Sequence, residues 1–372
     1  FLPMCASLYF WGAALFGPRV GMLASIFVAT SFYLHNFFLI GYLNPLAVLL
    51  LCALHAGWSK WSASDSCKIT SALALGLLSG SAYYVYLGPI LVVSVVPYVV
   101  YAMWRRKGAP SACRSLMISA LGAAVVLLPA VLNQDTFRMM VHVTSYSSEF
   151  TDQSQVVRNI QESFQVFWKN SRISHFIAGP YVDWITLYSA LAGLLAMVCK
   201  PRAGAFLLLT TFALVTTLIA VTSPYSYPPI TRGIVLVPFA CLFAALGFDF
   251  VIRWLPRLLR GASVVVLAVG LVVANAERAQ LSVVRHGVPR ESIAMRDIRA
   301  ALARCPTATI VRAHYPTDSP HFKDLGALAY VVSIQVGRKV SIVRAEEDSH
   351  QADSNVCEFY FTSQDERFQG TL

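Results

Sequence analysis

The sequence predicts a polytopic α-helical membrane protein with a small α/β extracytoplasmic domain at its C-terminal end. The 372 residues are 56% hydrophobic and only 13% charged, whereas about a quarter of the residues in a soluble domain are charged. Apolar runs recur along the first 275 residues, and a run of about 20 residues can cross the hydrocarbon core as a helix. Basic residues also gather in alternate connections, which is typical of membrane topology.

The net charge of +10 belongs entirely to the apolar part of the chain. Residues 276–372 contain twelve basic and twelve acidic residues and are therefore neutral. Twelve of the remaining bases lie in short connections, namely Arg19, Lys60, Lys68, Arg105, Arg106, Lys107, Arg114, Lys200, Arg202, Arg253, Arg257 and Arg260. Connections around 40–45 and 83–88 are nearly free of positive charge. The basic connections are therefore predicted to be cytoplasmic, and the charge gives no support to nucleic-acid binding.

This orientation predicts about ten crossings that alternate in direction. Their approximate limits are 2–17, 20–39, 46–58, 69–82, 88–104, 115–132, 184–199, 203–222, 233–252 and 261–275. The third and fourth runs are short for full spans, so we expect them to be tilted or partly re-entrant. Phe1 falls outside and follows no initiator Met or signal-peptide n-region. We therefore expect a fragment that lacks at least one upstream transmembrane helix and the outer loop after it.

The crossings divide the chain into four parts. These are transmembrane helices in 1–132, an extracytoplasmic loop in 133–183, further transmembrane helices in 184–275 and an extracytoplasmic α/β domain in 276–372. Within the loop, "QVVRNIQESFQVFWK" places Val156, Ile160, Phe164, Phe167 and Trp168 on one face at helical spacing. This amphipathic helix either lies on the outer membrane surface or packs on the other helices.

The C-terminal part shows the pattern of alternating helices and strands. "RESIAMRDIRAALARC" and "FKDLGALAYVVSIQVG" are helical patterns, whereas "TATIVRAHY", "RKVSIVRA" and "NVCEFYFTS" favour strands. It contains no Gly-rich phosphate fingerprint and no cluster of metal ligands, so we interpret it as an accessory domain. Cys305 and Cys357 are its only cysteines, and an oxidising compartment would permit them to form a disulfide.

Polar residues at the outer helix ends are the candidate site residues, because such groups are costly in a membrane. They are His35, Tyr42, Asn44, Tyr83, Tyr84, Tyr86, Glu149, Asp152, His175, Asp183, Tyr225, Tyr227 and Arg232. Simpler roles exist for several of them. The tyrosines fit an interfacial aromatic belt, the histidines can be structural, and Asp183 can cap the helix that begins at Trp184. Asp249 is expected to pair with Arg253 four residues later.

Arg232 is the strongest candidate in this set. It is the only basic residue in the three short outer turns. A guanidinium carries a permanent charge and a fork of donors that suits phosphate, which points to a lipid-linked donor at the outer surface. The alternative is that Arg232 snorkels to lipid headgroups.

Several stretches resemble the GT-C superfamily of membrane glycosyltransferases, in particular bacterial members similar to protein O-mannosyltransferases and aminoarabinose transferases. The resemblance covers about residues 10–255 and depends largely on helix order. It is carried by "FGPRVGMLASIFVATSFYLHNFFLIGYLNPLAVLLL", "ALGLLSGSAYYVYLGPILVV", "VFWKNSRISHFIAGPYVDWITLYSALAGLLAMV" and "PPITRGIVLVPFACLFAALGFDFV".

The resemblance implies an inverting transfer of a sugar from a polyprenyl-phosphate carrier to a lipid, glycan or protein acceptor on the outer face. Arg232, with Tyr225 and Tyr227, would bind the donor phosphate. Asn44, Tyr42, His35, Tyr83, Tyr84 and His175 would position the donor and acceptor. No cofactor is identified.

Two departures and two rival functions accompany this hypothesis. The catalytic acid of the family lies in the loop after its first helix, which the predicted topology places upstream of Phe1, so we expect this chain to lack it. Many members also carry an aspartate where this chain has Asn44, and asparagine cannot act as a general base.

The rival functions are a polyprenyl-lipid transporter or flippase, which would show polar groups deep in the membrane, and an O-antigen-ligase-like transferase.

Overall fold

The computed structural model describes most of the apolar part of the chain and three strands near its end. The described residues are 1–35, 44–64, 68–85, 87–105, 110–133, 153–168, 180–199, 201–223, 232–286, 302, 304–305, 309–314, 339–344 and 356–360. The chain divides into two compact units, Phe1–Ser282 and Val283–Leu372.

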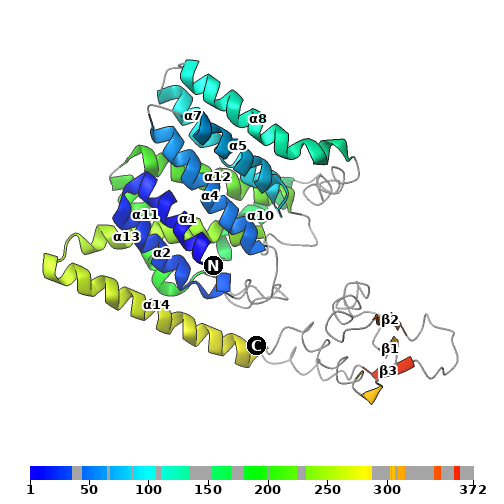
Figure 1. The fold of residues 1–372 in the computed structure, drawn as a ribbon. Coiled ribbons are helices and arrows are strands. Elements are labelled where there is room, and N and C mark those ends of the chain that lie inside the picture. The colour runs from blue at the N-terminus through cyan, green and yellow to red at the C-terminus, as the bar shows by residue number, and fades with distance from the viewer. Residues whose placement is uncertain are drawn as a thin grey trace. The chain divides into compact units, whose positions relative to one another are not determined.

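The first unit is built from helices. They are α1 (Leu2–Phe16), α2 (Pro18–Ala29), α4 (Asn44–Ala63), α5 (Ile69–Tyr83), α6 (Gly88–Val93), α7 (Val96–Arg105), α8 (Pro110–Leu132), α10 (Gln153–Gln165), α11 (Trp184–Cys199), α12 (Ala203–Thr222), the short 3-10 helix η2 (Arg232–Leu236), α13 (Val237–Ile252) and α14 (Arg257–His286). Figure 1 shows α1, α2, α4 and α11 to α13 gathered together, with α5 and α8 side by side at one flank.

Six described helical stretches are long and apolar enough to cross a membrane. They are α4, the α6–α7 pair, α8, α12, η2 with α13, and the Leu259–Ala276 part of α14. The apolar helices α1, α2, α5 and α11 are shorter. This is the architecture of a membrane-embedded helical protein, and the larger number of about ten crossings stays a prediction.

Three predicted crossings differ from the helices found, and one of them, 88–104, is divided into α6 and α7. The run 46–58 was expected to be short, but α4 continues to Ala63 and has 20 residues. Its last turns bury Trp58 and Trp61, so packing extends the helix beyond the apolar run. The expected crossing 20–39 is not one continuous helix, because α2 ends at Ala29. The Thr30 hydroxyl donates to the Ile26 carbonyl there (3.0 Å), a local bond that competes with helix continuation.

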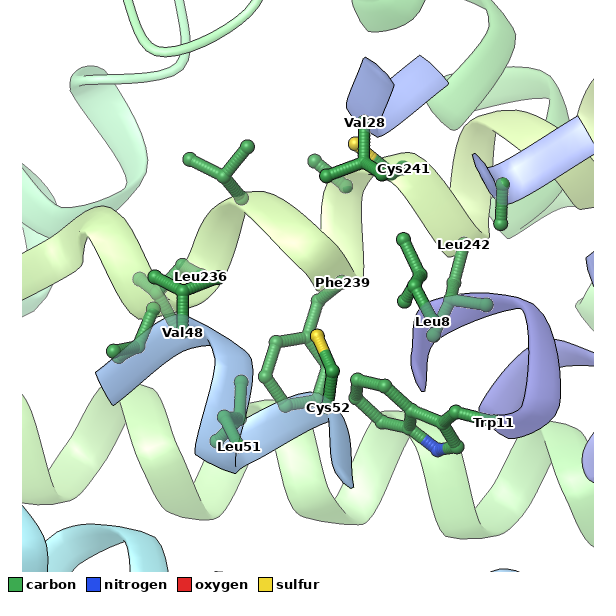
Figure 2. Close-up of a cluster of buried hydrophobic side chains, with 14 of the residues drawn as sticks. Leu8, Trp11, Val28, Val48, Leu51, Cys52, Leu236, Phe239, Cys241 and Leu242 are labelled. Atoms are coloured by element: carbon green, nitrogen blue, oxygen red, sulfur yellow. The ribbon is translucent and has the colours of Figure 1, made fainter. Parts of the chain in front are cut away.

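The core of the first unit is centred on α13. Figure 2 shows Phe239 and Leu242 of α13 facing side chains of α1 and α4, among them Leu8, Trp11 and Cys52. The Trp11 indole meets the Phe239 ring edge to face, with the ring centres 5.1 Å apart. Because lipid is as apolar as these side chains, close packing rather than escape from water favours this arrangement in a membrane.

Small residues allow several helix pairs to approach closely. A Cβ added at Gly193 of α11 would collide with the Phe243 carbonyl, and one at Gly247 of α13 would collide with the Ser189 carbonyl. In the α5–α8 pair, Gly76 lies against the backbone of Ser119. Small residues that bring helix backbones together are a usual device of membrane bundles.

The second unit contains three described strands. β1 (Ile310–His314), β2 (Ser341–Arg344) and β3 (Val356–Tyr360) form a parallel sheet in the order β2-β1-β3. Ile310 pairs with Ser341 on one side and Val356 on the other. Each strand lies in a stretch that the sequence favours as a strand. The two helical patterns, one before β1 and one between β1 and β2, fall largely outside the described residues, so the α/β domain stays a prediction.

Candidate functional site

One end of the bundle carries paired charges, and we call it the basic end. The Asp249 carboxylate accepts a hydrogen bond from Arg253, the predicted partner four residues later. Its other oxygen lies 3.7 Å from Arg19 at the start of α2. The predicted pair is confirmed, and the added contact ties α2 to the end of α13.

Two further arginines at the basic end bind the C-terminal carbonyls of helices. Arg105 Nη1 donates to the Ala63 carbonyl (2.6 Å) and the Ser62 carbonyl (3.3 Å) at the end of α4. Arg260 donates to the carbonyls of Leu255 (3.0 Å) and Arg253 (2.9 Å) after α13. These last carbonyls have no partner within their own helix, and a cation there also suits the helix dipole.

Arg232 lies at the opposite end, which we call the Arg232 end. It begins η2 and is only 7% exposed. Its Nη1 donates to the carbonyl of Thr222, the last residue of α12. The side chain is therefore buried and oriented by a helix C-terminus, a position unlike the exposed one that snorkelling requires.

Asp183 at the same end is held by hydrogen-bond donors. Its Oδ1 accepts from the Thr186 backbone N–H (2.9 Å), and its Oδ2 accepts from the Thr186 hydroxyl (2.7 Å). This confirms the predicted cap of α11. Asn275 of α14 also donates to Oδ2 (3.2 Å) and accepts from the backbone N–H of Phe32 (3.1 Å). The carboxylate therefore links three segments that are distant in the sequence.

Aromatic rings connect Asp183 to Arg232. Tyr181, two residues before Asp183, has its ring centre 4.4 Å from that of Tyr33. A Cβ added at Gly233 would lie 2.5 Å from the Tyr181 hydroxyl, so the ring packs on the backbone next to Arg232. We call Tyr33, Tyr181, Asp183, Arg232 and Asn275 the Arg232 cluster.

The amphipathic helix α10 packs on α12, the second of its two expected positions. Asn159 is buried and donates to the carbonyls of Ala220 (2.9 Å) and Ser223 (3.0 Å). The predicted apolar face is only partly buried, with Phe167 buried and Val156 and Ile160 half-buried. Phe164 and Trp168 are exposed, because the helix turns Asn159 toward the unpaired carbonyls of α12.

The other predicted site residues that the structure describes are not part of the Arg232 cluster. His35 is exposed, with Nε2 2.7 Å from the Ala29 carbonyl and its ring stacked on Phe1. The Tyr84 hydroxyl donates to the Val126 carbonyl of α8 (2.7 Å), and Tyr83 is half-buried at the end of α5. Asn44 is buried as the first residue of α4, a helix that packs on η2.

Several predicted residues lie outside the described part of the chain. They are Tyr42, Tyr86, Glu149, Asp152, His175, Tyr225 and Tyr227. The side chain of Cys357 is also outside it, so its pairing with Cys305 stays a prediction. Among the described residues, no group of three or more His, Cys, Asp or Glu side chains could hold a metal ion.

His55 is a deeply buried polar residue that the analysis of outer helix ends did not consider. It lies within α4, is 0% exposed, and stacks on the Trp11 indole with ring centres 4.7 Å apart. Its Nε2 is 3.1 Å from the Ser94 hydroxyl. A histidine within an apolar helix is a signal for a functional site in a membrane, and that signal was present in the sequence.

Comparisons with protein-family models and with curated proteins found no match. The geometry of the described residues therefore carries the functional argument.

Proposed function

We propose that this protein is a membrane glycosyltransferase that moves a sugar from a polyprenyl-phosphate-linked donor to a lipid, glycan or protein acceptor. The reaction would take place at the extracytoplasmic face of the inner, or plasma, membrane, where the C-terminal domain would also lie. The observation that supports this proposal is the buried guanidinium of Arg232. Within the described residues it contacts a helix C-terminus and no carboxylate.

A guanidinium in this setting suits the phosphate of a lipid carrier. It has several N–H donors in a planar fork, of which one is directed to Thr222. Burial lowers the local dielectric constant and strengthens the attraction between a cation and a phosphate oxygen. Fixed positive charge would also stabilise the phosphate as it leaves the sugar.

Asp183 is a poor internal counter-ion for Arg232. Both of its carboxylate oxygens accept hydrogen bonds from Thr186 or Asn275. Tyr181, which packs beside Arg232 through Gly233, comes from the same segment. In the proposal, Asp183 therefore fixes the wall of the site through Tyr181 and leaves the positive charge of Arg232 for the donor.

The remaining assignments rest on the resemblance. Tyr225 and Tyr227 would flank the donor phosphate, while Tyr42 and His175 would position donor and acceptor. Among the described candidates, Asn44 supports this role best, because it is buried at the start of a helix that packs on η2. His35 and Tyr84 are already bonded to protein carbonyls. The proposal assigns no general base among the described residues.

The test is binding of undecaprenyl phosphate to the purified protein in detergent, compared with binding of undecaprenol. We expect Arg232→Gln to weaken binding of the phosphate lipid by about tenfold or more, because a charge-assisted phosphate contact contributes roughly 1.5–3 kcal/mol. Binding of undecaprenol, which has no phosphate, should not change.

Arg260→Gln is the matched control, because Arg260 also binds helix C-terminal carbonyls but lies at the basic end. Thermal unfolding of each variant shows whether the fold is retained, and Arg232→Lys provides a second variant that keeps the charge. Equal binding by wild-type protein and a folded Arg232→Gln variant would remove Arg232 from the donor site. Transfer of sugar from a polyprenyl-phosphate donor, followed by mass spectrometry, then tests the reaction itself.

A second candidate is a polyprenyl-lipid transporter that performs no catalysis. The burial of His55 within α4 favours it, because polar groups deep in the membrane are typical of transporters. Movement of a fluorescent polyprenyl phosphate across proteoliposomes without transfer of sugar would support this function. An O-antigen-ligase-like transferase would instead transfer the sugar with the donor bound at the same arginine.

A further inference from the structure

His55 has one ring nitrogen with a partner and one without. Nε2 is 3.1 Å from the Ser94 hydroxyl. No hydrogen-bond partner among the described residues reaches Nδ1, which is fully buried. A buried polar atom without a hydrogen bond costs about 1–3 kcal/mol, so this atom needs an explanation.

The Ser94 hydroxyl identifies the tautomer of His55. This hydroxyl has a single hydrogen, which it donates to the Leu91 carbonyl at 2.6 Å. It can therefore only accept from His55, so the imidazole proton resides on Nε2. Nδ1 then carries a lone pair and requires a donor.

Further hydroxyls without partners lie in the same part of the bundle. Ser59 is one helical turn after His55 on α4, and Thr211 comes from α12. Both hydroxyls are buried and have no hydrogen-bond partner within geometric limits among the described residues. Both form hydrogen-bond contacts with the Tyr98 hydroxyl that are too weak to meet these limits, and the Tyr98 ring centre is 5.3 Å from that of His55.

The aromatic neighbours hold this region in place. Trp11 Nε1 donates to the Tyr98 hydroxyl at 3.0 Å. The indole also covers one face of the imidazole, and Phe239 contacts its edge. Nδ1 of His55 therefore remains without a hydrogen bond among the described residues, and the Ser59 and Thr211 hydroxyls have only their weak contacts with Tyr98.

We propose that the bundle core contains a water-binding site at His55. The water donates to Nδ1 of His55 and exchanges hydrogen bonds with the Ser59 and Thr211 hydroxyls. Buried waters typically bind about three polar groups that would otherwise be unsatisfied, and this set supplies that number. The site is separate from the Arg232 cluster and does not depend on the proposed transferase activity.

The first test observes His55 in the wild-type protein, reconstituted in lipid bilayers. His55 is the only histidine that is followed by alanine in the sequence. Labelling histidine and alanine together therefore selects the His55–Ala56 pair in a solid-state NMR spectrum. Water-edited magnetisation transfer should reach Nδ1 of His55, and the Nε2 resonance should show the directly bonded proton.

The second test measures coupling across the site. His55→Phe, Thr211→Val and the double variant are compared by their unfolding equilibrium constants in mixed detergent. If one water links the two side chains, the effects should depart from additivity by about threefold to tenfold. Thr210→Val is the matched control, because its side chain is half-buried on the same helix and its hydroxyl already donates to the Phe206 carbonyl.

Either measurement by itself can overturn the proposal. A dry site would give no water transfer to Nδ1 in the wild-type protein, whether or not any variant folds. The effects of His55→Phe and Thr210→Val should be additive. If the effects of His55→Phe and Thr211→Val are additive to the same degree, no water joins His55 and Thr211. Stabilisation by His55→Phe alone would indicate an unsatisfied imidazole in a dry core.

Discussion

Charged side chains at the two ends of the bundle differ in their burial and in the kind of partner they have. At the basic end, Asp249 lies between Arg19 and Arg253, and both arginines are 49% exposed. At the Arg232 end, Asp183 and Arg232 are both buried, and neither is paired with an opposite charge among the described residues. Uncharged groups hold them instead: Thr186 and Asn275 donate to Asp183, and the Thr222 carbonyl accepts from Arg232.

This difference separates charges that hold the bundle together from a charge that could bind a substrate. Asp249 forms ion pairs with Arg19 and Arg253, and these charges hold the start of α2 against the end of α13. At the other end the carbonyl of Thr222 orients Arg232 but does not cancel its charge, since a carbonyl is a dipole rather than an ion. Three experiments measure how far this comparison holds.

The largest effect is expected for Asp183→Ala. The substitution removes the cap of α11, leaves the Thr186 hydroxyl without its acceptor and removes one of the two acceptors of the Asn275 amide. We expect a loss of about 2–4 kcal/mol in the free energy of unfolding, measured by detergent-induced unfolding. Asp183→Asn should recover about half of this, because asparagine also caps helices well. Equal losses for both variants would mean that the charge, and not the cap, is what matters.

Asp249→Ala should cost less, about 1 kcal/mol, although Asp249 accepts from one arginine and lies near another. Both arginines are half exposed, so water can replace the lost carboxylate. The loss should shrink further at high salt, because screening already weakens the pairs in the wild-type protein. A loss as large as that of Asp183→Ala, or one unaffected by salt, would contradict the proposed difference between the ends.

The smallest effect is expected for Arg105→Ala, roughly 0.5 kcal/mol, because its bonds to the end of α4 lie at the exposed rim of the basic end. Arg114→Ala on α8 controls for the general loss of a positive charge. Thermal unfolding of both variants in the same detergent makes the comparison. If Arg105→Ala is no more destabilising than Arg114→Ala, capping by Arg105 adds nothing to stability.

Local patterns in the sequence were sufficient for many features of this fold. The limits of α11 and α12 follow from apolar runs that end at polar or basic residues. The cap by Asp183 and the pair of Asp249 with Arg253 involve residues three or four positions apart, which any α-helix brings together. The charge pattern also distinguished the basic end from the other end.

Contacts between distant segments were beyond such reasoning. The sequence placed Arg232 in an outer turn, but only the structure shows that its side chain is buried against the end of α12. In the same way, an apolar stripe on α10 suggested its buried face, but Asn159 decided the packing by binding the carbonyls of α12. Every residue type provides a backbone carbonyl, so the sequence does not show which carbonyls accept these hydrogen bonds.

By itself, therefore, the sequence determined that the chain is a helical membrane protein and where most of its helices run. Only the tertiary structure decided which polar groups are left without partners inside the bundle. His55 shows why: its place in α4 is a matter of sequence, but its bonded and unbonded nitrogens depend on Ser94 and Trp11 from other helices. Periodicity within one helix reports the direction of a side chain, and the packing of several helices determines what that side chain meets.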